Sequence, residues 1–190
     1  GGFMDYAWFV HTFDRMVPVQ VYGKTHPEYY ALVDGKRKAE HAERNQLCLS
    51  NEEVLRVCTE AVRRRLRERP DARLISISQN DWPEACQCEN CRRIDEEEAS
   101  GTLLRFVNRI AEALESEFPD VIFDTLAYQY TRPAPKLTHN RKNVCVRLCS
   151  IEACFAHPFE SCDDEARMLE RPDGTKTNFI SDLRDWGRIC

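Results

Sequence analysis

Strand-forming apolar runs alternate with amphipathic helical patterns along this chain, and this alternation limits its possible folds more than any other feature. Strands are predicted over 6–13, 73–81, 121–128 and 143–152, and helices over 50–69, 100–118 and 178–188. Ser50 is the expected N-cap of the first helix, with Glu53 completing a capping box and Pro70 ending the helix. Strands that alternate with helices pair in parallel, so the pattern predicts an α/β fold with a parallel sheet.

Two architectures contain such a sheet. No glycine-rich phosphate loop follows any predicted strand, which argues against a doubly wound nucleotide-binding fold. We therefore expect a (β/α)8 TIM-barrel-like fold. A complete barrel needs about 250 residues and eight strands, whereas only about four or five strands are visible here. Residues 1–190 are thus expected to be the central part of one catalytic barrel domain, an incomplete barrel fragment truncated at both ends.

Charge and hydropathy argue against two classes of partner. The formal net charge is −5, and the basic run 63–67 is typical of the solvated face of a helix, so a nucleic-acid surface has little support. No apolar run reaches about 18 residues, so no membrane span is expected. The first residues contain no signal peptide, which is either absent from this stretch or was removed upstream of it.

Polar and aromatic residues gather at the carboxyl ends of the predicted strands, where barrel enzymes carry their catalytic groups. Carboxylates transfer protons, amides bind hydroxyl or acetamide groups, and aromatic rings stack on sugars, so this collection suits a carbohydrate. The catalytic candidates are Asp81, Glu152 and Asn80. The substrate-binding candidates are His11, Gln79, Trp82, Tyr128, Tyr130 and Asp124.

Ten cysteines are many for 190 residues, and three of them lie in the motif Cys86-x-Cys88-x-x-Cys91. Zinc takes four ligands, so this motif would need a fourth, for which Cys149, Cys154 and His157 are equal candidates. A disulfide and plain reduced thiols are the alternatives. If a metal is present, we expect it to be structural, because the motif lacks the histidines and acids of a catalytic zinc site.

Several motifs, in order along the chain, resemble a known family. They are Trp8-Phe9-Val10-His11-Thr12-Phe13, His26-Pro27-Glu28-Tyr29-Tyr30-Ala31-Leu32 with Asp34-Gly35-Lys36-Arg37, Gln46-Leu47-Cys48-Leu49-Ser50-Asn51, Ser76-Ile77-Ser78-Gln79-Asn80-Asp81-Trp82, Cys86-Gln87-Cys88 with Cys91, and Asp124-Thr125-Leu126-Ala127-Tyr128-Gln129-Tyr130. Together they resemble the domain of unknown function 4838, and the resemblance runs from about Trp8 to Trp186.

That domain is associated with glycoside hydrolase family 163, which contains bacterial endo-β-N-acetylglucosaminidases that act on complex N-glycans. The resemblance implies a secreted, periplasmic or cell-surface bacterial enzyme that needs no cofactor. On an N-acetylglucosaminide the substrate's own acetamide can be the nucleophile. By analogy, Asn80 or Asp81 would orient the acetamide, Glu152 or Asp81 would protonate the leaving oxygen, and Tyr128 or Tyr130 would donate to the acetamide oxygen.

Three functions remain as alternatives at this stage. The first is a glycosidase that cleaves β-N-acetylglucosaminide linkages. The barrel fragment alone can be inactive even if the complete protein is an enzyme. The second is a barrel that binds carbohydrate without cleaving it. The third is a structural metal module built on the cysteines.

Overall fold

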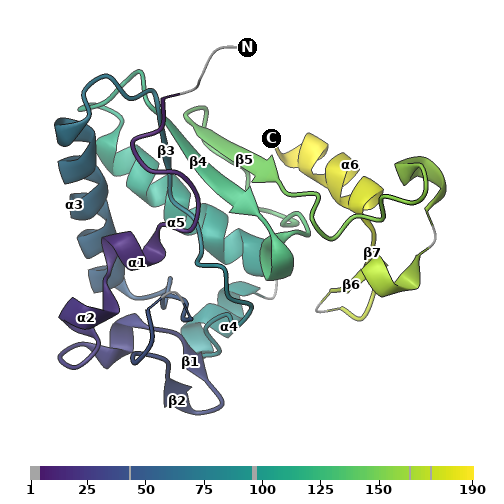
Figure 1. Cartoon of the computed structure of the whole chain (residues 1–190), viewed down its shortest axis with the longest axis horizontal. Coiled ribbons are helices and arrows are strands. Elements are labelled where there is room, and N and C mark those ends of the chain that lie inside the picture. The colour runs from purple at the N-terminus through teal and green to yellow at the C-terminus, as the bar shows by residue number, and fades with distance from the viewer. Residues whose placement is uncertain (1–4, 43, 96–97, 163, 172) are drawn as a thin grey trace.

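A three-stranded parallel sheet lies at the centre of the computed structural model, which describes residues 5–42, 44–95, 98–162, 164–171 and 173–190 (Figure 1). The strands are β3 (Leu74–Ser76), β4 (Ile122–Ala127) and β5 (Val144–Leu148), in the order β3-β4-β5. Ser76 pairs with Asp124, and Asp124 pairs with Cys145. The prediction of a parallel sheet is therefore confirmed, and all three strands point their carboxyl ends toward the same edge.

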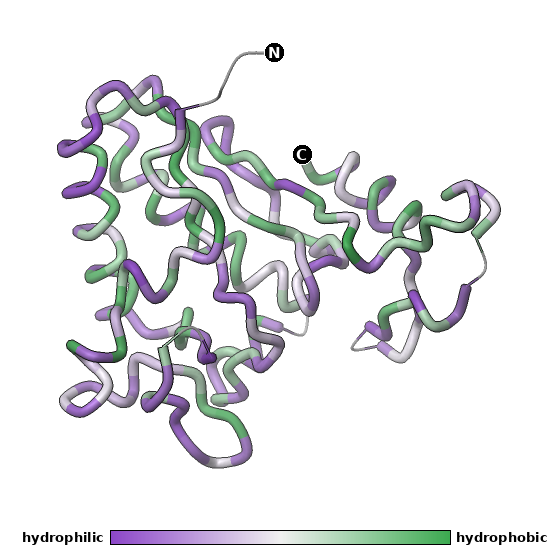
Figure 2. Tube along the Cα trace, viewed as in Figure 1, coloured by the Kyte–Doolittle hydropathy of each residue, from purple (hydrophilic) through white to green (hydrophobic). Residues whose placement is uncertain are grey.

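Two long helices pack on one face of this sheet. They are α3 (Glu52–Glu68) and α5 (Ala99–Leu114). Each carries an apolar stripe at helical spacing, and the stripes meet the alternate strand residues that point the same way. Figure 2 shows this as apolar colour along the sheet and the inward side of α3, with hydrophilic colour on its outward side. The fully buried members of this core include Phe13, Val54, Val62, Ile75, Ile110, Leu114 and Phe123.

The caps of these helices differ slightly from the prediction. Asn51, not Ser50, caps α3: its side-chain oxygen accepts hydrogen bonds from the backbone N–H groups of Glu53 and Val54, at 2.9 and 3.4 Å. The Ser50 hydroxyl instead lies among cysteine sulfurs, 3.2 Å from the Cys91 sulfur. Both residue types cap helices well, so the sequence alone did not separate them.

The N-terminal apolar run lies alongside β3 rather than joining the sheet as a full strand. Ala7 N–H donates to the Leu74 carbonyl at 2.8 Å, and Ser76 N–H donates to the Trp8 carbonyl at 2.9 Å. Tyr6 and Leu74 form an isolated parallel bridge. This run brings His11 to the same edge as the ends of the three strands.

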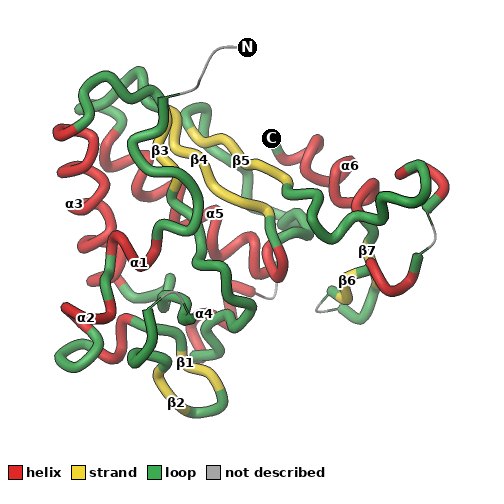
Figure 3. Tube along the Cα trace, in the orientation of Figure 1, coloured by secondary structure: helices red, strands yellow, loops and turns green. Residues whose placement is uncertain are grey.

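The shorter elements surround this core (Figure 3). Asp34 and Gly35 both have positive φ, and they join the two strands of an antiparallel hairpin. The elements not yet given are α1 (Phe13–Met16), α2 (Val19–Tyr22), η1 (Pro27–Tyr29), β1 (Leu32–Val33), β2 (Lys36–Arg37), α4 (Glu89–Asp95), η2 (Gln129–Thr131), η3 (Phe159–Ser161), η4 (Glu165–Arg167), β6 (Leu169–Glu170), β7 (Lys176–Thr177) and α6 (Phe179–Ile189).

A buried ion pair attaches the C-terminal part to the core. Arg132 Nε donates to Asp182 Oδ2 at 2.7 Å, and neither side chain is exposed. Arg132 also donates to the Thr177 carbonyl at 3.1 Å, and the Trp186 indole donates to the Arg132 carbonyl at 2.7 Å. These bonds satisfy charges that would otherwise be costly to bury, and they fix α6 beside the strand ends.

The barrel prediction is wrong. Among the described residues the parallel sheet has three strands and does not close, and the chain after β5 forms short helical turns, the antiparallel pair β6–β7 and α6 instead of a further strand of that sheet. The fold is a mixed α/β arrangement of short sheets. Closure depends on strand number, tilt and stagger, none of which a local hydrophobic period contains. None of the described helices is long and apolar enough to cross a membrane.

Candidate active-site cleft and metal centre

One hydrogen-bond network joins the loops that leave the three strands. Tyr128, after β4, donates its hydroxyl hydrogen to Oδ1 of Asp81, after β3, at 2.8 Å. The Gln129 side-chain amide donates to the same oxygen at 3.3 Å, and its backbone N–H donates to Glu152 Oε1, after β5, at 3.2 Å. The structure thus brings together Asp81, Tyr128 and Glu152, three of the residues selected from the sequence.

The backbone at this edge is held in an unfavourable conformation at two positions. Gln129 has φ of 50° and His11 has φ of 52°, in the left-handed region that side chains with a Cβ rarely adopt. His11 is anchored there through Nδ1, 2.9 Å from the Gln79 carbonyl oxygen, and its ring centroid lies 5.9 Å from that of Tyr128. Such strained residues gather at functional sites, where the surrounding structure holds them in place.

An open cleft of about 880 Å³ lies beside this network. Its size is within the range of small-molecule sites. Three side-chain oxygens of its lining residues are buried without a hydrogen-bond partner among the described residues: Glu98 Oε1, Gln129 Oε1 and Glu152 Oε2. Buried polar atoms are normally paired, so it is unusual that three residues lining one cleft each have an unpaired buried oxygen. The lining residues are Pro83, Glu98, Ala99, Gln129, Tyr130, Pro133, Glu152, Leu169, Glu170 and Arg171.

Burial changes the ionisation of several groups here. It raises the pKa of Glu98, with the positive charges of Arg171 and Lys136 opposing that shift. Burial, together with the bond to Asp81, raises the pKa of Tyr128 to about 12. Burial also raises the pKa of Tyr130. Both phenols therefore stay protonated at neutral pH and remain hydrogen-bond donors.

Glu98 was missed in the sequence. It is the N-cap of α5 and is 3% exposed. The feature of the sequence that could have identified Glu98 is its position as the last acid of the run 95–98, directly before an apolar helical stripe. A run of acids at a helix N-terminus is usually explained by the helix dipole alone, which is why the residue did not stand out.

Other predicted site residues lie away from the cleft surface. Asn80 is buried, and its amide bonds to Asn45 and to the backbone N–H of Asp14. Gln79 is also buried, and its amide donates to the Thr131 hydroxyl at 2.6 Å. These two side chains hold the loops in position, and Asp81 is the exposed member of this run.

Trp82 and Asp124 also make contacts of their own. The half-buried Trp82 donates its indole N–H to Glu84 at 2.8 Å. Asp124 lies in the middle of β4, is 2% exposed, and pairs with Arg147 at 2.7 Å and with the Tyr6 hydroxyl at 3.3 Å. The partner that a buried charge on this strand requires is therefore Arg147.

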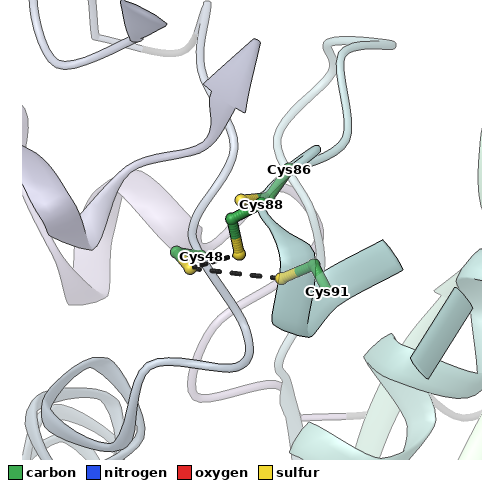
Figure 4. Close-up of side chains that lie close together, drawn as sticks. All are labelled: Cys48, Cys86, Cys88 and Cys91. Carbon is green, nitrogen blue, oxygen red and sulfur yellow. Dashed lines mark hydrogen bonds between the residues drawn. The ribbon is translucent and has the colours of Figure 1, made fainter. Parts of the chain in front are cut away.

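The cysteine motif finds its fourth member in Cys48. The sulfurs of Cys48, Cys86, Cys88 and Cys91 all lie within 4.8 Å of one another (Figure 4). The Cys48 sulfur is 3.7 Å from that of Cys88 and 4.0 Å from that of Cys91. Tetrahedral zinc with bonds of about 2.3 Å to sulfur separates its ligands by about 3.8 Å. These four thiols could thus hold a metal ion with little movement.

The surroundings of this cluster suit a group of negative sulfurs. The backbone N–H of Leu32 points to the Cys86 sulfur at 3.3 Å, and the Arg37 guanidinium lies 4.0 Å from the same atom. The Ser50 hydroxyl contacts the Cys88 and Cys91 sulfurs at 3.6 and 3.2 Å. Donors and a positive charge around the sulfurs are what a metal–thiolate centre needs in its outer shell.

None of the three fourth ligands considered in the sequence takes this position. Cys154 and His157 belong to a separate group with Cys162, and the Cys149 sulfur contacts the Arg147 carbonyl oxygen at 3.7 Å. Cys48 lies 40 residues before Cys88, outside the local motif. The loop before α3 brings it back to the motif, and local spacing contains no information about that return.

Replacement of Glu98 by Gln should change the pH dependence of stability in one direction. Because the folded pKa is raised above its ordinary 4.5, the stabilisation from the protonated carboxyl is full below that value and is lost as pH rises through the folded pKa. We expect the Gln variant, measured by urea unfolding, to gain free energy of unfolding relative to wild type as the pH rises from 4.5 through the raised folded pKa. A difference that stays constant over this range would contradict the burial of this carboxyl.

Comparison with known proteins places the chain in a family. The profile of a domain of unknown function, DUF4838, matches residues 1–190. No curated protein and no solved structure has significant similarity to the chain. Because the family match covers the entire sequence, this chain belongs to the DUF4838 family.

Proposed function

We propose that this domain cleaves β-N-acetylglucosaminide linkages of complex glycans as a glycoside hydrolase. The observation that carries the proposal is the set of unpartnered oxygens of Glu98, Gln129 and Glu152 in one open cleft. A sugar presents many hydroxyl donors, and rotation of these side chains toward the cleft would let their oxygens accept hydrogen bonds from it. Tyr130 lines the same cleft, and we assign its aromatic ring to stacking on a pyranose.

The hydrogen bonds of Asp81 and Glu152 favour a different role in cleavage for each carboxylate. Asp81 accepts hydrogen bonds from Tyr128 and Gln129, which hold it as an acceptor for an acetamide N–H. Glu152 has Oε1 fixed by the Gln129 N–H and Oε2 free. In the proposed reaction the acetamide carbonyl oxygen attacks the anomeric carbon, the glycosidic bond breaks, and Glu152 gives its proton to the leaving oxygen. Water then opens the cyclic intermediate and returns a proton to Glu152.

Glu98 has a different place in this scheme. Because burial raises its pKa, it remains neutral over a wider pH range than an exposed glutamate. In the neutral form it offers the substrate a donor as well as an acceptor. We assign it to the binding of a sugar hydroxyl.

Replacement of Glu152 by Gln should remove the proton donor while keeping the shape of the side chain. We expect the rate of glycan release from a complex N-glycoprotein to fall by about 10²- to 10⁴-fold, the usual contribution of general acid catalysis. The measurement is quantification of released glycan, with glycan binding followed separately. Turnover at the wild-type rate would sink the assignment of Glu152.

Asp120→Asn is the matched control. Asp120 lies at the opposite end of the sheet, just before β4, and its exposed carboxylate pairs with Arg73 at 3.3 Å. An exposed pair of this kind contributes about 0–1 kcal/mol. The control should therefore retain full turnover.

Asp81→Asn separates cleavage from binding. Loss of turnover in this variant supports catalysis, whereas weaker glycan binding by a protein that never cleaves supports a carbohydrate-binding role.

We further propose that the four-cysteine cluster holds a structural zinc ion. It ties together the β1–β2 hairpin, the loop before α3 and the start of α4. Thiolate ligands favour zinc over magnesium or calcium. Four protein ligands leave no position for substrate, which is the mark of a structural site.

Cys48→Ser should lower the zinc content of the purified protein by about one equivalent relative to wild type, because a serine hydroxyl is a poor zinc ligand. It should also lower the thermal midpoint. Metal analysis and thermal unfolding are the measurements. Cys145→Ser is the control, since Cys145 is exposed and lies outside both cysteine groups. Equal zinc in the two variants would contradict a metal at Cys48.

A further inference from the structure

A second group of sulfur and nitrogen ligands lies in the segment after β5. Sγ of Cys154, Nδ1 or Nε2 of His157 and Sγ of Cys162 lie within 4.8 Å of one another, and the Cys154 sulfur is 3.2 Å from Nδ1 of His157. The group shares no residue with the four-cysteine cluster. Three ligands from nine consecutive positions thus converge on one point without a regular helix or strand to impose it.

We propose that Cys154, His157 and Cys162 bind a second zinc-class cation. Bonds of about 2.3 Å to sulfur and about 2.0–2.1 Å to nitrogen give a tetrahedral sulfur–nitrogen separation of about 3.6 Å and a sulfur–sulfur separation of about 3.8 Å. The Cys154 sulfur lies 3.2 Å from Nδ1 of His157, and no pair of ligand atoms is more than 4.8 Å apart, so side-chain rotations would place all three atoms around an ion. Two sulfurs and an imidazole are ligands for zinc rather than for a hard cation.

Two of the three proposed ligands adjoin a small cavity, which His157 does not line. Cys154 and Cys162 line a small cavity of about 10 Å³, together with Glu152 and Asp164. A cavity of that size holds about one water molecule, and so one ion. The site also has a path to solvent, because His157 is exposed. With three protein ligands, the fourth position remains for water or another small ligand.

An ion at this site would also restrain Glu152, which lines the cleft and is close to Cys154 in the sequence. Cys154 follows Glu152 by two residues, so an ion held by Cys154 would restrain the segment that carries Glu152. The described elements of this segment are short: the 3-10 turns η3 and η4 and the pair β6–β7. The positioning effect rests on the proposed function, whereas the binding of metal does not.

A disulfide between Cys154 and Cys162 is the chemical rival. Its formation would remove two thiol hydrogens and two electrons, and would leave two fewer of the chain's ten thiols for titration. A metal site leaves every thiol titratable after the ion is chelated in denaturant. Thiol titration of protein purified without reductant therefore separates the two chemistries.

The test is zinc stoichiometry of the full chain and its variants, by metal analysis after equilibration with zinc alone and gel filtration. We expect about two equivalents for wild type and for Cys145→Ser, about one for Cys162→Ser and about one for Cys48→Ser. His157→Ala, which changes an exposed residue, should weaken the second site more than about 100-fold, since even outer-shell changes cost about 10- to 100-fold.

Cobalt provides the second readout. In Cys48→Ser protein loaded with Co²⁺, the sulfur-to-cobalt absorption band should persist and should fall when His157→Ala is added. Wild-type protein with one equivalent of zinc that Cys162→Ser does not change would overturn the proposal, as would eight titratable thiols in place of ten. Neither result depends on glycan cleavage, so failure of this site and failure of the proposed function are distinguishable.

Discussion

The parallel register of β3, β4 and β5 is the constraint from which the rest of the cleft follows. It sends three loops out of one edge, and a buried amide secures their relative positions: Gln79, at the end of β3, donates to the Thr131 hydroxyl and to the Tyr128 carbonyl beyond β4. Leaving such groups unpaired in the interior would cost about 1–3 kcal/mol each. The loops therefore have one low-energy arrangement, in which Asp81, Tyr128 and Glu152 belong to one network.

The cysteine cluster is linked to the same cleft through a shared residue. Tyr130 lines both the cleft and a small cavity that Cys86 and Cys91 also line. A metal at the four cysteines would thus fix one wall of the cleft through Tyr130, while the ion proposed at Cys154 would fix the segment of Glu152. In this account the metals do no chemistry on the substrate, and the protein's own carboxylates and phenols carry the reaction.

Local patterns predicted the elements well and their assembly less well. Apolar runs, amphipathic helical patterns and Pro70 located the two long helices and the parallel strands. The same patterns were wrong about the barrel, because closure is a property of the entire sheet. Among the candidate site residues, Asp81 and Glu152 were selected from the sequence because each ends a predicted strand. Cys48 and Glu98 were not, since each reaches its site through tertiary packing that no local spacing describes.

The most direct test of the central claim is the affinity of the wild-type protein for a thiazoline mimic of the cyclised N-acetylglucosamine intermediate, measured by titration calorimetry beside N-acetylglucosamine itself. An enzyme of this kind is complementary to the cyclic state, and transition-state analogues bind about 10²- to 10⁸-fold more tightly than substrates. We expect the thiazoline mimic to bind at least about 100-fold more tightly than N-acetylglucosamine. Equal affinity for the two compounds would contradict cleavage by an acetamide nucleophile in this cleft.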